Sequence, residues 1–324
     1  MKIKKEKALW ILYGGILILL FLLSSTDLII KEKKSEVYPI SVIIEDARDD
    51  YYVNFRKGMD RAALDLNADV SFITLYESGS QKQQTDLMLR EQQDGARALI
   101  VSPVSDQALS QLLTENRLTG PLILLNSRLT GERIASGISP DYYAMGQMLG
   151  QAAVREQPRD LPVYLFAEKK PEGVTAQIYD GVCAALQEAG RLWTLHIRQQ
   201  EDTFQTVVER LTDPGSINAV IIALDPGSLS ETAAVLEDNR ACAACVNGLY
   251  GRGTTIPILN YLDKGVITGI CVTDDFSAGY LSVRKAVEAV KLRTGQDRVT
   301  LESYYIRKED IRKKEYEAML YPIE

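Results

Sequence analysis

Beyond residue 37, short runs of β-branched and aliphatic residues alternate with longer stretches whose apolar residues recur at helical spacing. A short apolar run bounded by polar residues favours a buried strand, and a stripe at i, i+3, i+4 and i+7 favours an amphipathic helix. The pattern predicts strands at residues 40–44, 70–75, 98–101, 122–125, 163–166, 193–197, 219–224, 242–246, 267–272 and 303–306. Predicted strands and helices therefore alternate along most of the chain.

Polar residues and glycines mark where several of the intervening helices begin and end. Ser105 is an N-cap candidate for the helix that follows it. Gly190 is suited to the C′ position of a preceding helix, because glycine adopts the left-handed backbone conformation without strain. Gly295 stops the last long helix. The predicted helices cover about residues 55–66, 81–93, 105–113, 145–152, 178–189, 204–211, 229–236, 256–262 and 276–290.

The continuously apolar strands indicate parallel sheets that helices cover on both faces. Strand–helix–strand alternation gives right-handed crossovers and a doubly wound sheet. The strands are too many for one ordinary open sheet, so two sheets in two α/β lobes are the simpler solution. Residues 137–141 (GISPD) are the expected first crossing, because they break the pattern and open a new helix. Ligands of doubly wound sheets bind at the carboxyl ends of the strands, so two facing lobes with a hinge predict a cleft.

The first 36 residues form a segment of a different kind. Four lysines precede an uncharged run of 19 residues, ALWILYGGILILLFLLSST, which would rise about 28 Å as a helix. The lysine excess places the N-terminus in the cytoplasm and the rest of the chain outside it. A retained single-pass anchor is the preferred interpretation. A signal peptide cleaved near the small residues 24–26 is the alternative, and a buried core helix is a third.

Charge argues against nucleic acid as a partner. Residues 37–324 hold 30 Lys and Arg against 40 Asp and Glu, a net charge of −10. Nucleic-acid affinity depends on clustered Lys and Arg. The expected partners are therefore a small molecule, a membrane and another protein.

The candidate catalytic and metal-binding motifs are weak. Cys242 and Cys245 form a C-x-x-C within a predicted apolar strand without a second ligand pair, so buried structural cysteines are preferred over a disulfide or a metal site. His196 is the only histidine, which argues against a serine triad. Residues 248–253 (GLYGRG) would suit an anion-binding loop, although a plain flexible loop explains them as well. We expect neither an enzyme nor a cofactor.

Several segments resemble a known family. ISVIIEDARDDYYVNFRKGMDRAA, RALIVSPVSDQAL, PLILLNSR and ISPDYYAMGQMLGQ occur in an order and spacing similar to those of periplasmic binding proteins of the ribose-binding type. That family shares its fold with the effector domains of the lac-repressor family. The resemblance covers roughly residues 38–306.

The resemblance implies three crossings between the lobes. The first lobe would comprise residues 37–138 and 274–300, and the second would comprise residues 139–273 and 301–324. Residues 1–36 would form a cytoplasmic tip, the anchor and a linker. The fold class expected is therefore two doubly wound parallel-sheet lobes joined by a multi-strand hinge, preceded by one transmembrane helix.

The resemblance also implies a sugar or polyol ligand, which aromatic rings and planar polar groups would recognise. Tyr51 and Tyr52 match the family's aromatic pair, which could instead pack at a helix start. Asp49 and Asp274 are candidates that helix capping would explain equally well. The remaining candidates match family positions or follow predicted strands: Asn126, Arg128, Asp141, Asp225 and Asn247.

Departures from the family pattern bear on the ligand. Ile178 and Ser127 stand where arginines are usual, Leu224 replaces a common Asn, and Thr273 replaces a common Gln. The expected function is a solute-binding protein that captures a small polar ligand for an ABC importer. The alternative is a ligand-sensing partner of a membrane receptor kinase.

Overall fold

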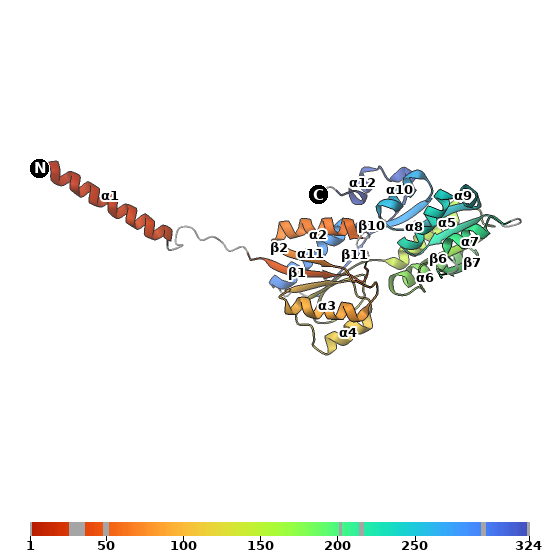
Figure 1. Ribbon diagram of the computed structural model, residues 1–324, viewed down its shortest axis with the longest axis horizontal. Coiled ribbons are helices and arrows are strands. Elements are labelled where there is room, and N and C mark those ends of the chain that lie inside the picture. The colour runs from red at the N-terminus through yellow and green to blue at the C-terminus, as the bar shows by residue number, and fades with distance from the viewer. Residues whose placement is uncertain are drawn as a thin grey trace. The chain divides into compact units, whose positions relative to one another are not determined.

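The computed structural model describes residues 2–25, 36–47, 52–200, 203–213, 217–292 and 296–322 (Figure 1). Contacts divide the chain into two units, Met1–Val37 and Tyr38–Glu324. The first unit contains one helix, α1 (Lys2–Ser25).

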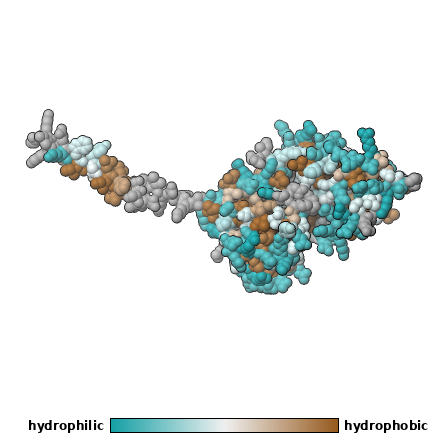
Figure 2. Space-filling view, viewed as in Figure 1, coloured by the Kyte–Doolittle hydropathy of each residue, from teal (hydrophilic) through white to brown (hydrophobic). Residues whose placement is uncertain are grey.

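Helix α1 carries large apolar side chains in contact with solvent, including Leu9, Trp10 and Phe21. Figure 2 shows apolar surface on the described part of this helix. Among the helices of the described residues, none reaches the length and hydropathy that a membrane crossing requires. The expected transmembrane anchor is therefore not supported.

The second unit begins with a sheet of six parallel strands in the order β11-β5-β4-β3-β1-β2. Its strands are β1 (Tyr38–Ile43), β2 (Ala68–Ile73), β3 (Ala98–Val101), β4 (Leu122–Leu125), β5 (Ile134–Pro140) and β11 (Asp297–Leu301). Its helices are α2 (Val53–Leu66), α3 (Gln81–Gln93), α4 (Asp106–Thr114) and α11 (Asp275–Leu292). Helices α2 and α11 cover one face and α3 and α4 the other (Figure 1). We call this sheet with its four helices the first lobe.

The second sheet has the order β12-β10-β9-β8-β6-β7, with only β12 antiparallel. Its strands are β6 (Val163–Ala167), β7 (Trp193–Ile197), β8 (Ala219–Ala223), β9 (Val246–Arg252), β10 (Gly269–Thr273) and β12 (Ser303–Arg307). Its helices are α5 (Tyr142–Glu156), α6 (Gly173–Glu188), α7 (Phe204–Arg210), α8 (Pro226–Asp238), α9 (Arg240–Cys245), α10 (Ile256–Lys264), the 3₁₀ turn η2 (Lys308–Asp310) and α12 (Lys314–Leu320). We call this sheet with its helices the second lobe.

Both sheets are buried on their two faces, as the sequence predicted. All residues of β3, β4 and β8 are buried. In β1, Ile40 and Val42 face the core under α2 and α11, while Ile43 faces the core under α3 and α4. Two α/β lobes built on parallel sheets are therefore confirmed.

Glycines let paired helices pack backbone to backbone in each lobe. A Cβ on Gly58 of α2 would lie 1.9 Å from the Phe276 carbonyl oxygen, and one on Gly279 of α11 would lie 2.0 Å from the Phe55 carbonyl oxygen. In the second lobe, a Cβ on Gly146 of α5 would lie 2.2 Å from the Ile178 carbonyl oxygen. These contacts leave no room for a methyl group, so they set the interhelical distances.

The chain passes between the sheets three times. It leaves the first sheet after β5, returns after β10 into α11, and crosses again between β11 and β12. The lobe boundaries predicted from the sequence, 37–138 with 274–300 and 139–273 with 301–324, stay a prediction.

One predicted strand and one predicted loop are wrong. Residues 240–245 form helix α9, which Asn239 caps by accepting from the amides of Ala241 and Cys242. Residues 246–252, which include most of the expected glycine loop, form the buried strand β9. A short apolar stretch suits either helix or strand, and glycine is a poor strand former, so local pattern misled here. Cys242 and Cys245 are free thiols.

Helix α12, which the sequence pattern missed, joins the two lobes. Its Met319 and Leu320 are buried in the second-lobe core together with Ile306. The side chains of Asn54 and Lys57, both on α2 of the first lobe, donate hydrogen bonds of 3.1 Å to the carbonyls of Leu320 and Pro322. The C-terminal segment therefore forms a strap between the lobes.

Candidate functional site

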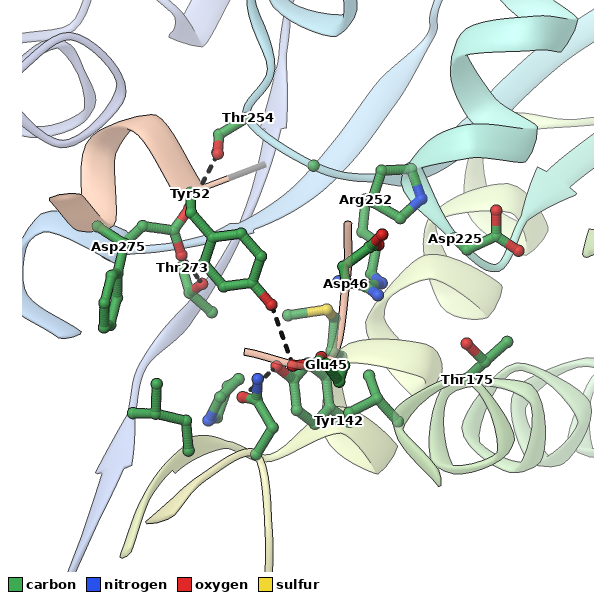
Figure 3. Close-up of a pocket in the computed structure, with 18 of the residues that line it drawn as sticks. Glu45, Asp46, Tyr52, Tyr142, Thr175, Asp225, Arg252, Thr254, Thr273 and Asp275 are labelled. Carbon is green, nitrogen blue, oxygen red and sulfur yellow. Dashed lines mark hydrogen bonds between the residues drawn. The ribbon is translucent and has the colours of Figure 1, made fainter. Parts of the chain in front are cut away.

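A cavity of about 470 Å³ lies at the carboxyl ends of strands from both sheets. Glu45 follows β1 and Asn126 follows β4 in the first lobe, while Asp225 follows β8 and Arg252 ends β9 in the second. Strand ends of doubly wound sheets are where loops present polar groups to a ligand. Figure 3 labels Glu45, Arg252 and Asp225 among the residues around this cavity. The cavity is large enough for a small polar molecule.

Two tyrosines organise one part of the cavity. The Tyr52 hydroxyl donates to Glu45 Oε2 at 3.2 Å, and the Tyr142 hydroxyl donates to Asn126 Oδ1 at 2.7 Å (Figure 3). Tyr142 belongs to α5 of the second lobe and Asn126 to the first, so their hydrogen bond crosses between the lobes. Asn126 has a φ of 58°, a left-handed conformation that asparagine tolerates better than most residues. That backbone turn aims its amide at the cavity.

Two carboxyl groups of the first lobe are partly desolvated in the cavity. Burial raises the pKa of Glu45, and hydrogen bonds from Ser102 and Tyr52 oppose that rise. Burial likewise raises the pKa of Asp275, opposed by hydrogen bonds from Thr254 and Thr273 at 2.9 and 3.0 Å. Burial penalises the charged form of a carboxyl group, so both positions gain from a donor that a ligand brings.

The second lobe contributes a guanidinium and a helix cap. Arg252 lies 5.8 Å from the centre of the Tyr142 ring, and its buried Nε has no hydrogen-bond partner among the described residues. Asp225 caps α8, because its two oxygens accept from the amides of Ser228 at 2.8 Å and Glu168 at 2.9 Å. Lys169 and Lys170 are exposed at the cavity rim. Arg252 is therefore the second-lobe side chain best placed to bind a ligand acceptor.

Three of the residues predicted from sequence line the cavity, namely Tyr52, Asn126 and Asp225. Asp49 and Tyr51 lie outside the described residues. The other four side chains do not line it.

Arg128 is exposed, and its carbonyl accepts from Arg298. Asp141 accepts from the Ala144 amide at 3.0 Å and so caps α5 instead of reaching a ligand. Asp274 is engaged in the same way, because its carboxylate accepts from the amide and hydroxyl of Ser277.

Asn247 lies at the amino end of β9, the end of the strand away from the cavity. It accepts from Asn218 at 2.9 Å. It was expected near the ligand because the strand was placed at residues 242–246. Because strand β9 in fact begins at Val246, the residue at its carboxyl end is Arg252.

Sequence reasoning missed Glu45, Tyr142 and Arg252, and it chose Asp274 over its neighbour Asp275. Glu45 directly follows the first apolar run, so its position at a strand end was visible in the sequence. Arg252 was hidden because its strand was interpreted as a loop. Tyr142 and Asp275 sit beside the predicted Asp141 and Asp274, and only the helix start decides which neighbour faces inward.

The comparisons with known proteins agree with this geometry. A family model described as a periplasmic binding protein domain matches residues 40–296. No curated protein matches the chain.

The matches to solved structures of the same fold span nearly the whole length of each solved chain. A carbohydrate-transporter solute-binding protein from Agrobacterium radiobacter, in complex with D-arabinose, is 16% identical with a TM-score of 0.73, covering 87% of this chain and 98% of that one. GanP, a glucose-galactose binding protein from Geobacillus stearothermophilus, is 18% identical with a TM-score of 0.71, covering 86% and 100%. A chain from the complex of the TorS sensor domain with TorT is 17% identical with a TM-score of 0.71, covering 86% and 99%. At these identities the likeness shows the fold alone.

The matching family is one of binding proteins, which confirms the expectation that the chain is not an enzyme. The family model covers most of the chain and both lobes, and its domain contains the cavity at the strand ends. The chain belongs to the periplasmic binding protein family.

Proposed function

We propose that this protein binds a sugar in the cavity between its lobes, outside the cytoplasm, and delivers it to an ABC importer. The observation that carries the proposal is the convergence of hydrogen-bonding side chains from both lobes on one cavity. Sugars present many hydroxyls, which carboxylate, amide and guanidinium groups bind well. Contacts from both lobes form together only when the lobes are close, so ligand binding favours closure.

The ligands named for similar structures support a sugar. Solute-binding proteins of this fold were crystallised with D-arabinose, D-tagatose in its α-pyranose form, D-allose and D-fucose. The side chains of Glu45, Asn126 and Arg252 supply the corresponding types of acceptor and donor here.

A thermal-shift panel of pentoses, hexoses and polyols tests the proposal. A ligand that binds only the folded protein stabilises it by about 2.7 kcal/mol at one hundred times its dissociation constant. We expect at least one sugar to raise the melting temperature by several degrees. The Arg252→Met variant should lose most of this shift, whereas Lys82→Met on the exposed surface of α3 should keep it. A panel in which no sugar or polyol stabilises the protein contradicts the proposal.

Sensing is a second candidate. One chain of similar fold was crystallised with the TorS sensor domain, and the arginines usual at positions 127 and 178 are absent here. A closed form could therefore dock onto a receptor kinase instead of a permease. Ligand-dependent binding to the extracytoplasmic domain of a kinase encoded beside this protein favours sensing, and ligand-dependent stimulation of a neighbouring permease and ATPase favours transport.

A further inference from the structure

The two walls of the cavity differ in charge. The described side chains that line it from the first lobe include the acids Glu45, Asp46 and Asp275, but neither lysine nor arginine. The second lobe supplies the basic side chains Lys169, Lys170 and Arg252 together with the acids Glu168, Glu172 and Asp225. Lys169 and Lys170 are exposed at the rim, and Asp225 caps α8. A ligand in this cavity therefore meets negative charge on one side.

Glu45 is the acid without a compensating charge. Its carboxylate accepts hydrogen bonds from Ser102 and Tyr52, and its neighbour Asp46 is also acidic. No basic side chain of the described residues forms an ion pair with it. Burying a carboxylate without an opposite charge is unfavourable, and a hydroxyl donates a hydrogen bond but brings no positive charge. A cationic donor would compensate the charge in full.

The surroundings of Glu45 also suit a cation. Tyr52 contacts Glu45, and Tyr142 reaches the same part of the cavity from the opposite lobe (Figure 3). The faces of aromatic rings attract ammonium groups, and the attraction grows when water is excluded. Arg252 lies 5.8 Å from the centre of the Tyr142 ring, and its buried Nε has no hydrogen-bond partner among the described residues. Arg252 is therefore available to a ligand acceptor, whereas Glu45 offers an acceptor to a ligand donor.

We propose that the ligand carries a protonated amine that binds Glu45 between Tyr52 and Tyr142, while its hydroxyls bind Asn126 and Arg252. The ligand class is thus an amino sugar. The inference rests on the proposed sugar-binding function and specifies it. An ammonium donates a hydrogen bond to Glu45 and also brings an opposite charge, which a hydroxyl does not, so the amine gives both affinity and orientation.

Calorimetry on the full chain near neutral pH tests the amine directly. The probes are D-glucosamine, N-acetyl-D-glucosamine and D-glucose, with the corresponding galactose series. The acetylated sugars keep the nitrogen and the ring but lose the charge. We expect each free amine to bind at least about tenfold more tightly than its acetylated and hydroxyl counterparts, the ratio expected when one charge-assisted contact is lost.

The Glu45→Gln variant provides the matched test. Glutamine keeps the size and one acceptor but removes the charge, so amine affinity should fall about tenfold and affinity for the neutral sugars should change little. Glu132→Gln, at an exposed position away from the cavity, should change neither. Melting curves establish that each variant is folded.

The outcomes separate the two proposals. Neutral sugars that bind as tightly as the amines overturn the amine inference and leave sugar binding intact. An amine preference that persists in Glu45→Gln overturns the assignment to Glu45. If no probe of either series and no other sugar binds, the proposed function fails, and the amine inference fails with it.

Discussion

The strap formed by the C-terminal segment should strengthen ligand binding. Asn54 and Lys57 on α2 bind the carbonyls of Leu320 and Pro322, whose segment is anchored in the second-lobe core. These hydrogen bonds exist only while the lobes keep their present arrangement. Replacing both donors in Asn54→Ala/Lys57→Ala therefore removes contacts that hold the lobes together and leaves the cavity lining untouched.

The size of the effect follows from the two bonds. A neutral hydrogen bond contributes about 1 kcal/mol net, and one from a charged donor somewhat more. Lys57 and Asn54 are only partly buried, so solvent competes for both donors. We expect the double variant to lose about 1.5 kcal/mol of interlobe stabilisation, which weakens apparent ligand affinity roughly tenfold through the smaller population of closed protein.

Calorimetry with the sugar that most stabilises the wild type measures this loss, and small-angle X-ray scattering of the ligand-free protein measures lobe separation. We expect a larger radius of gyration for the double variant. Arg61→Ala is the control, because Arg61 lies on the same helix and its ion pair among the described residues is the local one with Asp65. An affinity within twofold of wild type together with an unchanged radius of gyration would refute the role of the strap.

Three further predictions concern folding and pH. Gly58→Ala should lower the unfolding free energy by about 2 kcal/mol in denaturant titrations, because its Cβ would lie 1.9 Å from a backbone oxygen. Gly131→Ala is the control: its Cβ would lie 3.6 Å from the nearest atom, so the unfolding free energy should change by less than about 0.5 kcal/mol. Because burial raises the pKa of Glu45, the folded state binds the Glu45 proton more tightly than the unfolded state does. The protonated carboxyl group therefore stabilises the fold at low pH, and this stabilisation is lost as the pH rises above 4.5, the ordinary pKa of this side chain. Glu45→Gln should thus melt at a higher temperature than wild type near neutral pH, and this advantage should shrink in acid; a difference independent of pH contradicts the assignment. Asp225→Ala should cost about 2 kcal/mol, because it leaves two amides without their acceptor, and Asp225→Asn, which retains one acceptor oxygen, should cost about half as much by the same measurement.

The sequence by itself determined most of the secondary structure and the fold class. Strands β3 and β4 occur at the predicted residues, because buried parallel strands must be apolar throughout. Ser105 caps α4 by accepting from the Ala108 amide, and Gly190 follows α6 with a φ of 65°. Capping depends on side chains within one turn of the helix end, so these features could be predicted locally.

Only the tertiary structure decided the assignments that depend on distant neighbours. Residues 240–245 and 246–252 are ambiguous by pattern, and strand β9 forms because it pairs with β8 and β10. The same pairing brings Arg252 to the cavity and leaves Asn247 at the opposite end. Tyr142 instead of Asp141, and Asp275 instead of Asp274, face inward because each acid caps the helix that the neighbouring residue begins. A polar residue near a strand end is visible in the sequence, but its orientation depends on which backbone amides need an acceptor once the lobes are packed.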